Sequence, residues 1–72
     1  MASIIGKGVL EPYSQLLAVP APVPATLLPD LLKLPDNYRE NIIAVRGNRA
    51  LSLDELIYDD DEIFLFISVM GG

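Results

Sequence analysis

An unbroken apolar run near the end of the chain, residues 63–67 (IFLFI), constrains the fold most strongly. Its β-branched and aromatic residues favour a strand, and the acidic residues 59–62 before it are typical of a turn. A strand that is apolar on both sides must have both faces covered. We therefore predict a strand over residues 63–67 in the middle of a sheet.

Side chains alternate along this predicted strand, so its apolar residues form two rows. Ile63, Leu65 and Ile67 share one face, and Phe64 and Phe66 share the other. A chain of 72 residues can cover one face of its sheet with a helix but is too short to cover both. We expect the aliphatic row under the helix and the two phenylalanines on the open face, where a partner can bind. The alternative is that both rows are core.

The sequence finishes with Gly71 and Gly72. A glycine pair is a poor end for a strand, because glycine loses the most conformational freedom and has no side chain to pack. Without β-carbons, the pair suits a tail that is threaded through a narrow channel. We expect one domain over residues 1–72 with a flexible tail at about residues 69–72. A stub without function is the alternative.

Residue types exclude most enzyme mechanisms. The chain has no cysteine and no histidine, so it offers no disulfide, thiolate nucleophile, imidazole base or ordinary zinc site. We expect neither catalytic residues nor a metal site.

The formal net charge is −5, and residues 50–72 hold six acids and no base. A field of this sign repels phosphate backbones, so we expect no nucleic-acid partner. The acidic residues 54–62 either face a basic docking surface or form a solvated loop. No apolar run approaches the ~20 residues of a membrane span, and the N-terminus lacks a signal pattern. We expect no membrane association and a cytoplasmic location.

The first half of the chain predicts a hairpin and a helix. Strands are expected over residues 3–10 and 15–19, and the proline-rich residues 20–24 can only be an extended connection. Thr26 is expected to cap a helix that Pro35 ends. The core face of this helix is a stripe of leucines: Leu27, Leu28, Leu31, Leu32 and Leu34.

The second half predicts two further strands before the one at residues 63–67. We expect strands over residues 42–45 and 50–53, joined by a turn that holds Arg46 and Arg49, and one helical turn over residues 54–58. The turn arginines either bind an acidic partner or are solvated. The order of elements is strand, strand, helix, strand, strand, strand, which indicates an α+β fold.

The chain from residue 42 onward resembles a known family. An acidic turn, a hydrophobic strand ending near Phe66, Val69 three residues before Gly72, and the final glycine pair are similar to the ubiquitin-like sulfur carriers. These are the small subunit of molybdopterin synthase (MoaD type) and the thiazole-biosynthesis carrier (ThiS type). Asp60 stands where the family often has a turn glycine. The resemblance implies a β-grasp fold with a mixed sheet of four to five strands, the last in the middle, and one main helix on one face.

The resemblance also implies a chemistry, in which the chain is a carrier and not by itself an enzyme. An adenylating enzyme of the ubiquitin-activating type would couple the Gly72 carboxylate to AMP from ATP. Sulfur from a donor such as a cysteine desulfurase system would then replace AMP and give a thiocarboxylate. Because the chain has no cysteine, this carboxylate is the only attachment point. No cofactor is bound, and the ATP is used by the activating partner.

Roles for single residues follow from the same resemblance. Gly71 would give clearance, Met70 and Val69 would line the path of the tail, and Phe64 and Phe66 would contact the partner. The sulfur would serve molybdopterin synthesis with the large synthase subunit as partner.

Three alternatives stay open. The sulfur can instead serve thiamine synthesis, with thiazole synthase as the partner. The chain can also be a protein modifier that is conjugated to lysines through Gly72, or a plain interaction domain. The molybdopterin branch is favoured by the spacing Phe66-x-x-Val69-x-Gly-Gly, although Ile67 and Ser68 replace the prolines common there.

Overall fold

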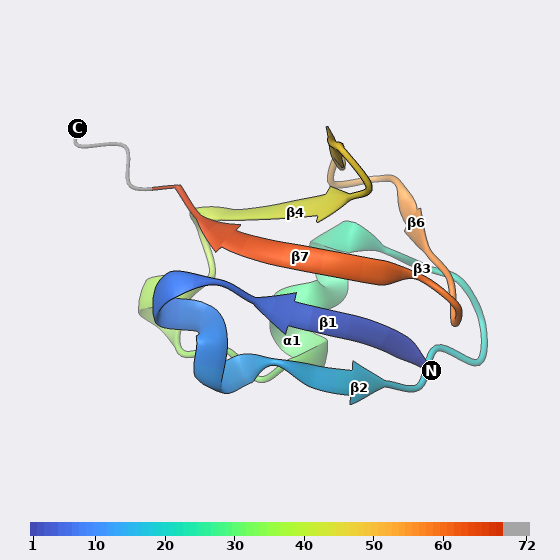
Figure 1. Ribbon diagram of the computed structural model, residues 1–72, viewed down its shortest axis with the longest axis horizontal. Helices are drawn as coiled ribbons and strands as arrows, with labels where there is room; N and C mark the ends of the chain where they lie inside the picture. Colours follow the sequence, from blue (N-terminus) through green and yellow to red (C-terminus); the bar gives the residue numbers. More distant parts are fainter. Residues whose placement is uncertain (69–72) are drawn as a thin grey trace.

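A mixed five-stranded sheet organises the chain, and the computed structural model describes residues 1–68 of it. The strand order is β2-β1-β7-β4-β5 (Figure 1). The strands are β1 (Ala2–Gly6), β2 (Gln15–Leu17), β4 (Ile42–Arg46), β5 (Arg49–Ala50) and β7 (Glu62–Ile67). The last strand, β7, runs parallel to β1 and antiparallel to β4. The predicted central position of this strand is therefore confirmed.

The connection between β1 and β2 differs from the simple turn that we predicted. The strand expected over residues 3–10 ends at Gly6, and a 3-10 helix, η1 (Gly8–Tyr13), follows. Gly8 has a φ of 59°, a left-handed conformation that suits glycine. The amide of Gly6 donates to Ser14 Oγ at 2.9 Å, which closes the loop. β2 is shorter than predicted and stops at Leu17.

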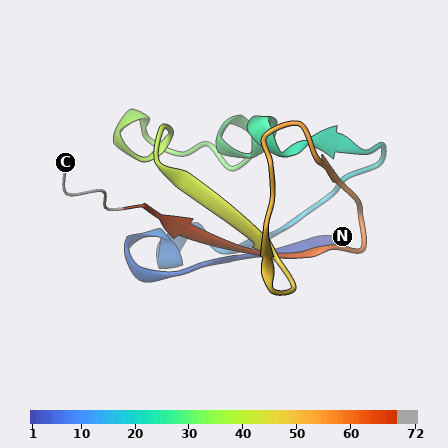
Figure 2. The same ribbon diagram turned by 90° about the horizontal axis from the view of Figure 1, so that it is seen from above.

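The helical segment is short and covers one face of the sheet (Figure 2). It consists of a 3-10 turn, η2 (Ala25–Leu27), and one turn of α-helix, α1 (Leu28–Leu31). The predicted cap is wrong, because the Thr26 side chain makes no capping hydrogen bond. The predicted end at Pro35 is also wrong. Lys33 adopts a φ of 57°, and the amide of Leu34 donates back to Pro29 O, so the helix closes in a left-handed turn before the proline.

This early end changes which leucines are core. Leu28, Leu32 and Leu34 are buried, as predicted, whereas Leu27 and Leu31 are 40% and 39% exposed. One helical turn is too short to present a five-leucine stripe to the sheet.

The helical turn predicted at residues 54–58 is wrong, because Leu56 and Ile57 form a strand. β6 (Leu56–Ile57) pairs antiparallel with β3 (Val23–Pro24) in a small two-stranded sheet. Pro24 is tolerated because it lies at an edge. Likewise β5 stops at Ala50, short of the predicted 50–53, and Leu53 is 70% exposed. A further 3-10 turn, η3 (Asp36–Tyr38), lies between α1 and β4.

One hydrophobic core lies between the sheet and the helical segment. Ile4, Ile63 and Leu65 supply it from the sheet, and Leu10 supplies it from η1. Among residues 1–68, none of the helices has the length and apolar character needed to cross a bilayer. The chain is a small α+β structure with a mixed five-stranded sheet and one short α-helix.

Candidate functional site

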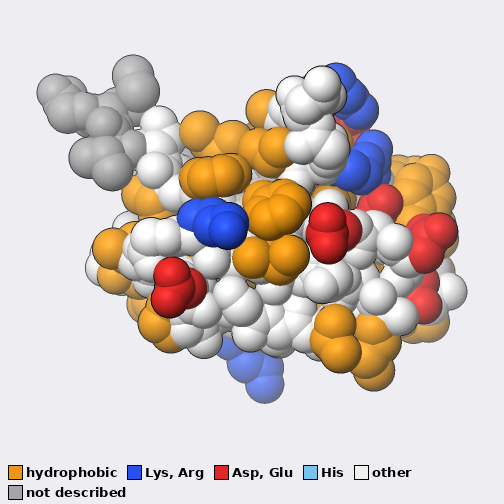
Figure 3. Space-filling view, in the orientation of Figure 1, with side chains coloured by type: hydrophobic (Ala, Val, Ile, Leu, Met, Phe, Trp, Pro, Cys, Tyr) orange, Lys and Arg blue, Asp and Glu red, His pale blue; other side chains and the backbone are white. Residues whose placement is uncertain are grey.

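The face of the sheet opposite α1 is open. Figure 3 shows hydrophobic side chains gathered over its middle. On β7, Ile63 and Leu65 are fully buried beneath the helical segment, while Phe64 is half-buried and Phe66 is 40% exposed on the other side. The predicted separation of the two rows is confirmed, and the predicted binding role of the phenylalanines stays a prediction.

Neighbouring strands extend the two phenylalanines into a patch. Phe64 lies opposite Ile5 of β1 and Val45 of β4, and Phe66 lies opposite Ile43, which is 38% exposed. Cross-strand neighbours on one face have β-carbons about 5 Å apart, so these side chains form a continuous surface. We call Ile5, Ile43, Val45, Phe64 and Phe66 the open-face patch.

Lys7 places a positive charge on this patch. Its backbone amide donates to Leu65 O at 2.9 Å, so the residue is held beside β7 just after β1 ends. Its Nζ lies 5.3 Å from the centroid of the Phe64 ring, a cation–π arrangement. Lys7 makes no ion pair within residues 1–68. In that part of the chain, no carboxylate forms an ion pair with this charge on the open face.

A shallow groove lies at the end of the patch where β7 ends. It measures about 280 Å³ and is lined by Lys7, Gly8, Val9, Phe66 and Ile67. Neither Lys7 nor Val9 was predicted from the sequence as a site residue. Alternation continued from Ile5 through Gly6 would have placed Lys7 on the open face, but the loop that brings Val9 there has no sequence signal.

The remaining predicted site residues, Val69, Met70, Gly71 and Gly72, lie outside the described residues. The chain is fixed up to the residue before them, because the Ser68 amide donates to Asn41 O at 2.7 Å. The terminal sequence thus starts from a defined point at the end of the central strand, next to the groove.

Two acidic residues of the 54–62 segment, Asp59 and Asp61, make hydrogen bonds and ion pairs within the molecule, unlike residues of a solvated loop. Asp59 accepts hydrogen bonds from the Val19 amide and from the N-terminal ammonium of Met1, and these lower its pKa. Asp61 pairs with Arg46 at 3.0 Å. Neither of the two predicted uses of Arg46, a partner contact or simple solvation, describes this internal pair.

Arg49, the second turn arginine, is also paired internally. Its guanidinium donates to both carboxylate oxygens of Glu55, at 2.7 and 2.9 Å, and the Ser52 amide donates to the same carboxylate at 2.7 Å. The hydrogen bonds from Arg49 and then from Ser52 lower the pKa of Glu55 to about 2. The same contact raises the pKa of Arg49. Together these bonds hold the chain between β5 and β6.

Substitution Glu55→Gln is expected to remove a pH-dependent part of the stability. Because the folded state lowers the pKa of Glu55 from 4.5 to about 2, the unfolded state binds its proton more readily as the pH falls. The contribution of the Glu55 carboxylate to stability is therefore complete above pH 4.5 and is lost as the pH falls through about 2. Thermal melts should show a lower Tm for E55Q at neutral pH and a gap that closes in acid.

The control for this prediction is Glu40→Gln, which removes one charge at an exposed carboxylate without an ion pair in residues 1–68. A gap between E55Q and the unsubstituted protein that stays constant from neutral pH to acid would contradict the prediction.

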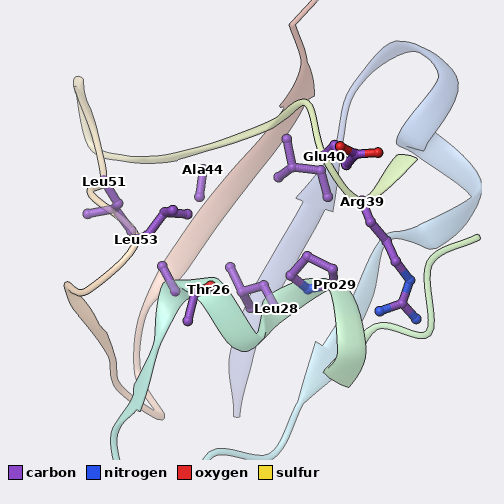
Figure 4. Close-up of a pocket in the computed structure, with 10 residues that line it drawn as sticks. Thr26, Leu28, Pro29, Arg39, Glu40, Ala44, Leu51 and Leu53 are labelled. Carbon is purple, nitrogen blue, oxygen red and sulfur yellow. The ribbon is translucent and has the colours of Figure 1, made fainter. Parts of the chain in front are cut away.

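A second cleft, of about 190 Å³, lies on the helical side. Figure 4 shows Thr26, Leu28 and Pro29 on one side of it and Ala44, Leu51 and Leu53 on the other. Arg39 lies at its rim, but its guanidinium turns away and bonds to Leu34 O and Asp30. The cleft is mostly apolar. The sequence did not indicate it, because its walls come from segments far apart in the chain.

Within residues 1–68 there is no cluster of three or more potential metal-ligating side chains. Comparison of the chain with protein-family models, with curated proteins and with solved structures finds no match.

Proposed function

We propose that this chain is a ubiquitin-like β-grasp protein that carries sulfur as a thiocarboxylate on its C-terminal glycine, Gly72. The proposal takes Gly72 as the last residue of the active protein. The observation that carries it is that the central strand, which forms the middle of an open apolar face, is followed after one residue, Ser68, by the sequence VMGG at residues 69–72.

The strand order supports the β-grasp part of the proposal. β1 and β2 form one antiparallel pair, β4 and β5 form another, and β7 lies between the two pairs and parallel to β1. The helical segment lies between the pairs in sequence and on one face of the sheet in space (Figures 1 and 2). This is the arrangement implied by the family resemblance, with a shorter helix.

The open-face patch supports the partner contact. Phe66 and Ile43 are each more than a third exposed, although both are large apolar residues on regular strands. Contiguous exposed apolar surface of this kind is typical of a binding site. An activating enzyme that contacted the patch would lie beside Ser68, four residues before Gly72. Its nucleotide site would then be within reach of the terminal carboxylate.

The proposed chemistry starts from a poor electrophile, because a carboxylate is already negatively charged. An oxygen of the Gly72 carboxylate attacks the α-phosphorus of ATP and pyrophosphate leaves, which gives an acyl-adenylate. The terminal sulfur of a persulfide then attacks the acyl carbon, and AMP leaves with the electron pair of the broken carbon–oxygen bond. A thiol cleaves the resulting acyl disulfide. The thiocarboxylate is released, and the thiol and the donor cysteine end as a disulfide.

We assign the carried sulfur to molybdopterin synthesis. The support is the spacing of Phe66, Val69 and the glycine pair. In this assignment the tail enters the active site of the large synthase subunit, and the thiocarboxylate acts as the sulfur nucleophile. The choice between this pathway and thiazole synthesis is tested by adding the thiocarboxylated chain to each of the two synthase partners.

The test of the proposal is the intact mass of the protein after incubation with ATP, a persulfide donor, a thiol and the activating enzyme of its own organism. We expect one oxygen to be replaced by one sulfur, with fragmentation locating the change to Gly72. The activating enzyme is first shown to act on its own carrier. If this enzyme then gives lysine conjugates of the chain without the exchange of oxygen for sulfur, the result supports the modifier function and contradicts the proposal.

Substitution Gly71→Ala is the matched variant for this test. An added methyl group should block threading and abolish the mass change, while the Tm stays that of the unsubstituted protein. The comparison for stability is Leu65→Ala, which changes a fully buried side chain. A loss of Tm in G71A as large as that in L65A would contradict a role for Gly71 in threading.

A further inference from the structure

The charges around the open-face patch have a symmetric arrangement. Glu62 begins β7 and is exposed, and it lies on the same face as Phe64 and Phe66 because side chains alternate along the strand. Lys7 reaches the same face at the other end, where its Nζ lies over Phe64. Figure 3 shows an acidic and a basic side chain on opposite sides of the central hydrophobic cluster. Within residues 1–68, Glu62 and Lys7 are thus an anion and a cation without an ion pair on the same face as Phe64.

The register gives the spacing of these two charges. Gly6 lies opposite Leu65, so Lys7 follows beside Phe66, four residues along β7 from Glu62. At about 3.3 Å per residue, the backbone positions are about 13 Å apart, with Phe64 midway. Neither Lys7 nor Glu62 makes an ion pair within residues 1–68. A two-fold axis that lies in the interface above Phe64, perpendicular to β7, would place Lys7 of each copy near Glu62 of the other.

We propose that the open-face patch binds a second copy of this chain in a two-fold symmetric dimer. Each Lys7 would pair with Glu62 of the other copy, and the two Phe64 rings would meet near the axis. An isologous interface of this kind needs a self-complementary surface. The row of Glu62, Phe64 and Lys7 supplies one, because rotation about the axis places each charge over its opposite.

The overall charge is compatible with this dimer. Each copy carries a net charge of −5, so two copies repel at long range. The two-fold axis, however, places the acidic ends of the two β7 strands at opposite ends of the interface. The acidic end of one copy, with Asp60 and Glu62, then faces the Lys7 end of the other. An alignment of the two strands in the same direction would instead bring like charges together.

The dimer is expected to be weak and transient. The open face is about 20 Å wide, from a strand spacing of about 4.8 Å, and is short along the strands. Interfaces below about 1,200 Å² are typical of transient complexes, and we expect a dissociation constant on the order of 100 μM. If the carrier function proposed above holds, a dimer would cover the surface that the activating enzyme needs. Dimer formation and activation would then compete.

Sedimentation velocity tests the dimer with charge-reversed variants, at concentrations from about tenfold below to tenfold above the expected dissociation constant. The variants are Lys7→Glu, Glu62→Lys and the double variant that carries both. Each single reversal places like charges together and should weaken association at least about tenfold, whereas the double variant restores opposite charges and should associate like the unsubstituted protein.

Lys33→Glu is the matched control. Lys33 is the other lysine without an ion pair in residues 1–68, it follows α1 on the helical side, and its reversal changes the net charge by the same amount as Lys7→Glu. Association in K33E should equal that of the unsubstituted protein. Circular dichroism melts identify any variant that has lost its fold. If a charge-reversed variant does not fold, the neutral variants Lys7→Gln and Glu62→Gln are used in its place.

Three results would overturn the proposal. They are a monomer at every concentration, single reversals that associate like the unsubstituted protein, and a double variant that does not recover. The dimer and the carrier function fail separately. A monomeric protein leaves thiocarboxylate formation possible, and a protein that accepts no sulfur leaves its concentration-dependent sedimentation unchanged.

Discussion

Substitution Gly6→Ala is expected to destabilise the protein by about 3 kcal/mol, because the added methyl group has no space. An ideal Cβ on Gly6 would lie 2.0 Å from Leu10 O and 2.5 Å from the carbonyl carbon of Leu10. These are backbone atoms of η1, and Leu10 itself is fully buried, so the clash cannot be relieved by turning a side chain. Either β1 or η1 must move. Urea unfolding monitored by circular dichroism measures the loss.

Substitution Gly47→Ala is the control for this steric argument. Gly47 lies in the turn between β4 and β5 with a φ of 67°, and an added Cβ there would meet nothing within 4 Å. The loss of stability in G47A should be only that of placing an L-residue in a left-handed conformation, about 1 kcal/mol. Equal losses in G6A and G47A would show that backbone conformation, and not the contact with Leu10, explains the effect at Gly6.

Substitution Leu65→Ala is expected to cost about 4 kcal/mol, near the upper end for a buried leucine. Leu65 is fully buried in the central strand, and its two cross-strand neighbours are the small residues Gly6 and Ala44. Neither neighbour has a side chain that can move into the space. A domain of this size has a total stability of roughly 4 to 11 kcal/mol, so L65A should lie close to unfolding.

Substitution Phe66→Ala is the control for this cavity. Phe66 follows Leu65 on the same strand but is 40% exposed on the open face. Its removal should cost about 1 kcal/mol, because little contact with the core is lost. Chemical denaturation of the two variants under the same conditions makes the comparison. A loss in F66A equal to that in L65A would place Phe66 in the core and remove it from the open-face patch.

The features that the sequence analysis predicted correctly are those that depend on local patterns. The run at residues 63–67 is apolar at every position, which predicted a central strand, and β7 lies in the middle of the five-stranded sheet, although only the face with Ile63 and Leu65 is covered. Alternation then separates Leu65 from Phe66 whatever the neighbours are. Proline chemistry excluded a central strand at residues 20–24 and predicted an extended connection, and the structure has only the two-residue strand β3 at the end of this segment.

The incorrect predictions concern segments whose structure depends on distant partners. Leu56 and Ile57 form a strand because Val23 and Pro24 offer an edge to pair with, and this partner lies more than 30 residues away. The early end of α1 depends on a left-handed Lys33, a conformation that lysine rarely adopts on its own. The extent of the predicted leucine stripe was wrong for the same reason.

The candidate site divides in the same way. The separation of the two phenylalanines from the aliphatic row was predicted from the sequence alone, because side chains alternate along a strand. Lys7 and the groove beside Phe66 were not, because they depend on the parallel pairing of β1 with β7 and on the path of η1. The internal pairing of Arg46 with Asp61 likewise joins residues that only the folded chain brings together.

By itself, then, the sequence determined the central strand, the composition of its two rows and the absence of thiol and imidazole chemistry. These follow from residue type and from a period of two, which are local properties of the chain. Only the tertiary structure decided which charges stay free and which are paired. That choice depends on distances between segments, and loop paths such as η1 set those distances. In the part of the chain that the structure describes, Lys7 and Glu62 stay without an ion pair as a result.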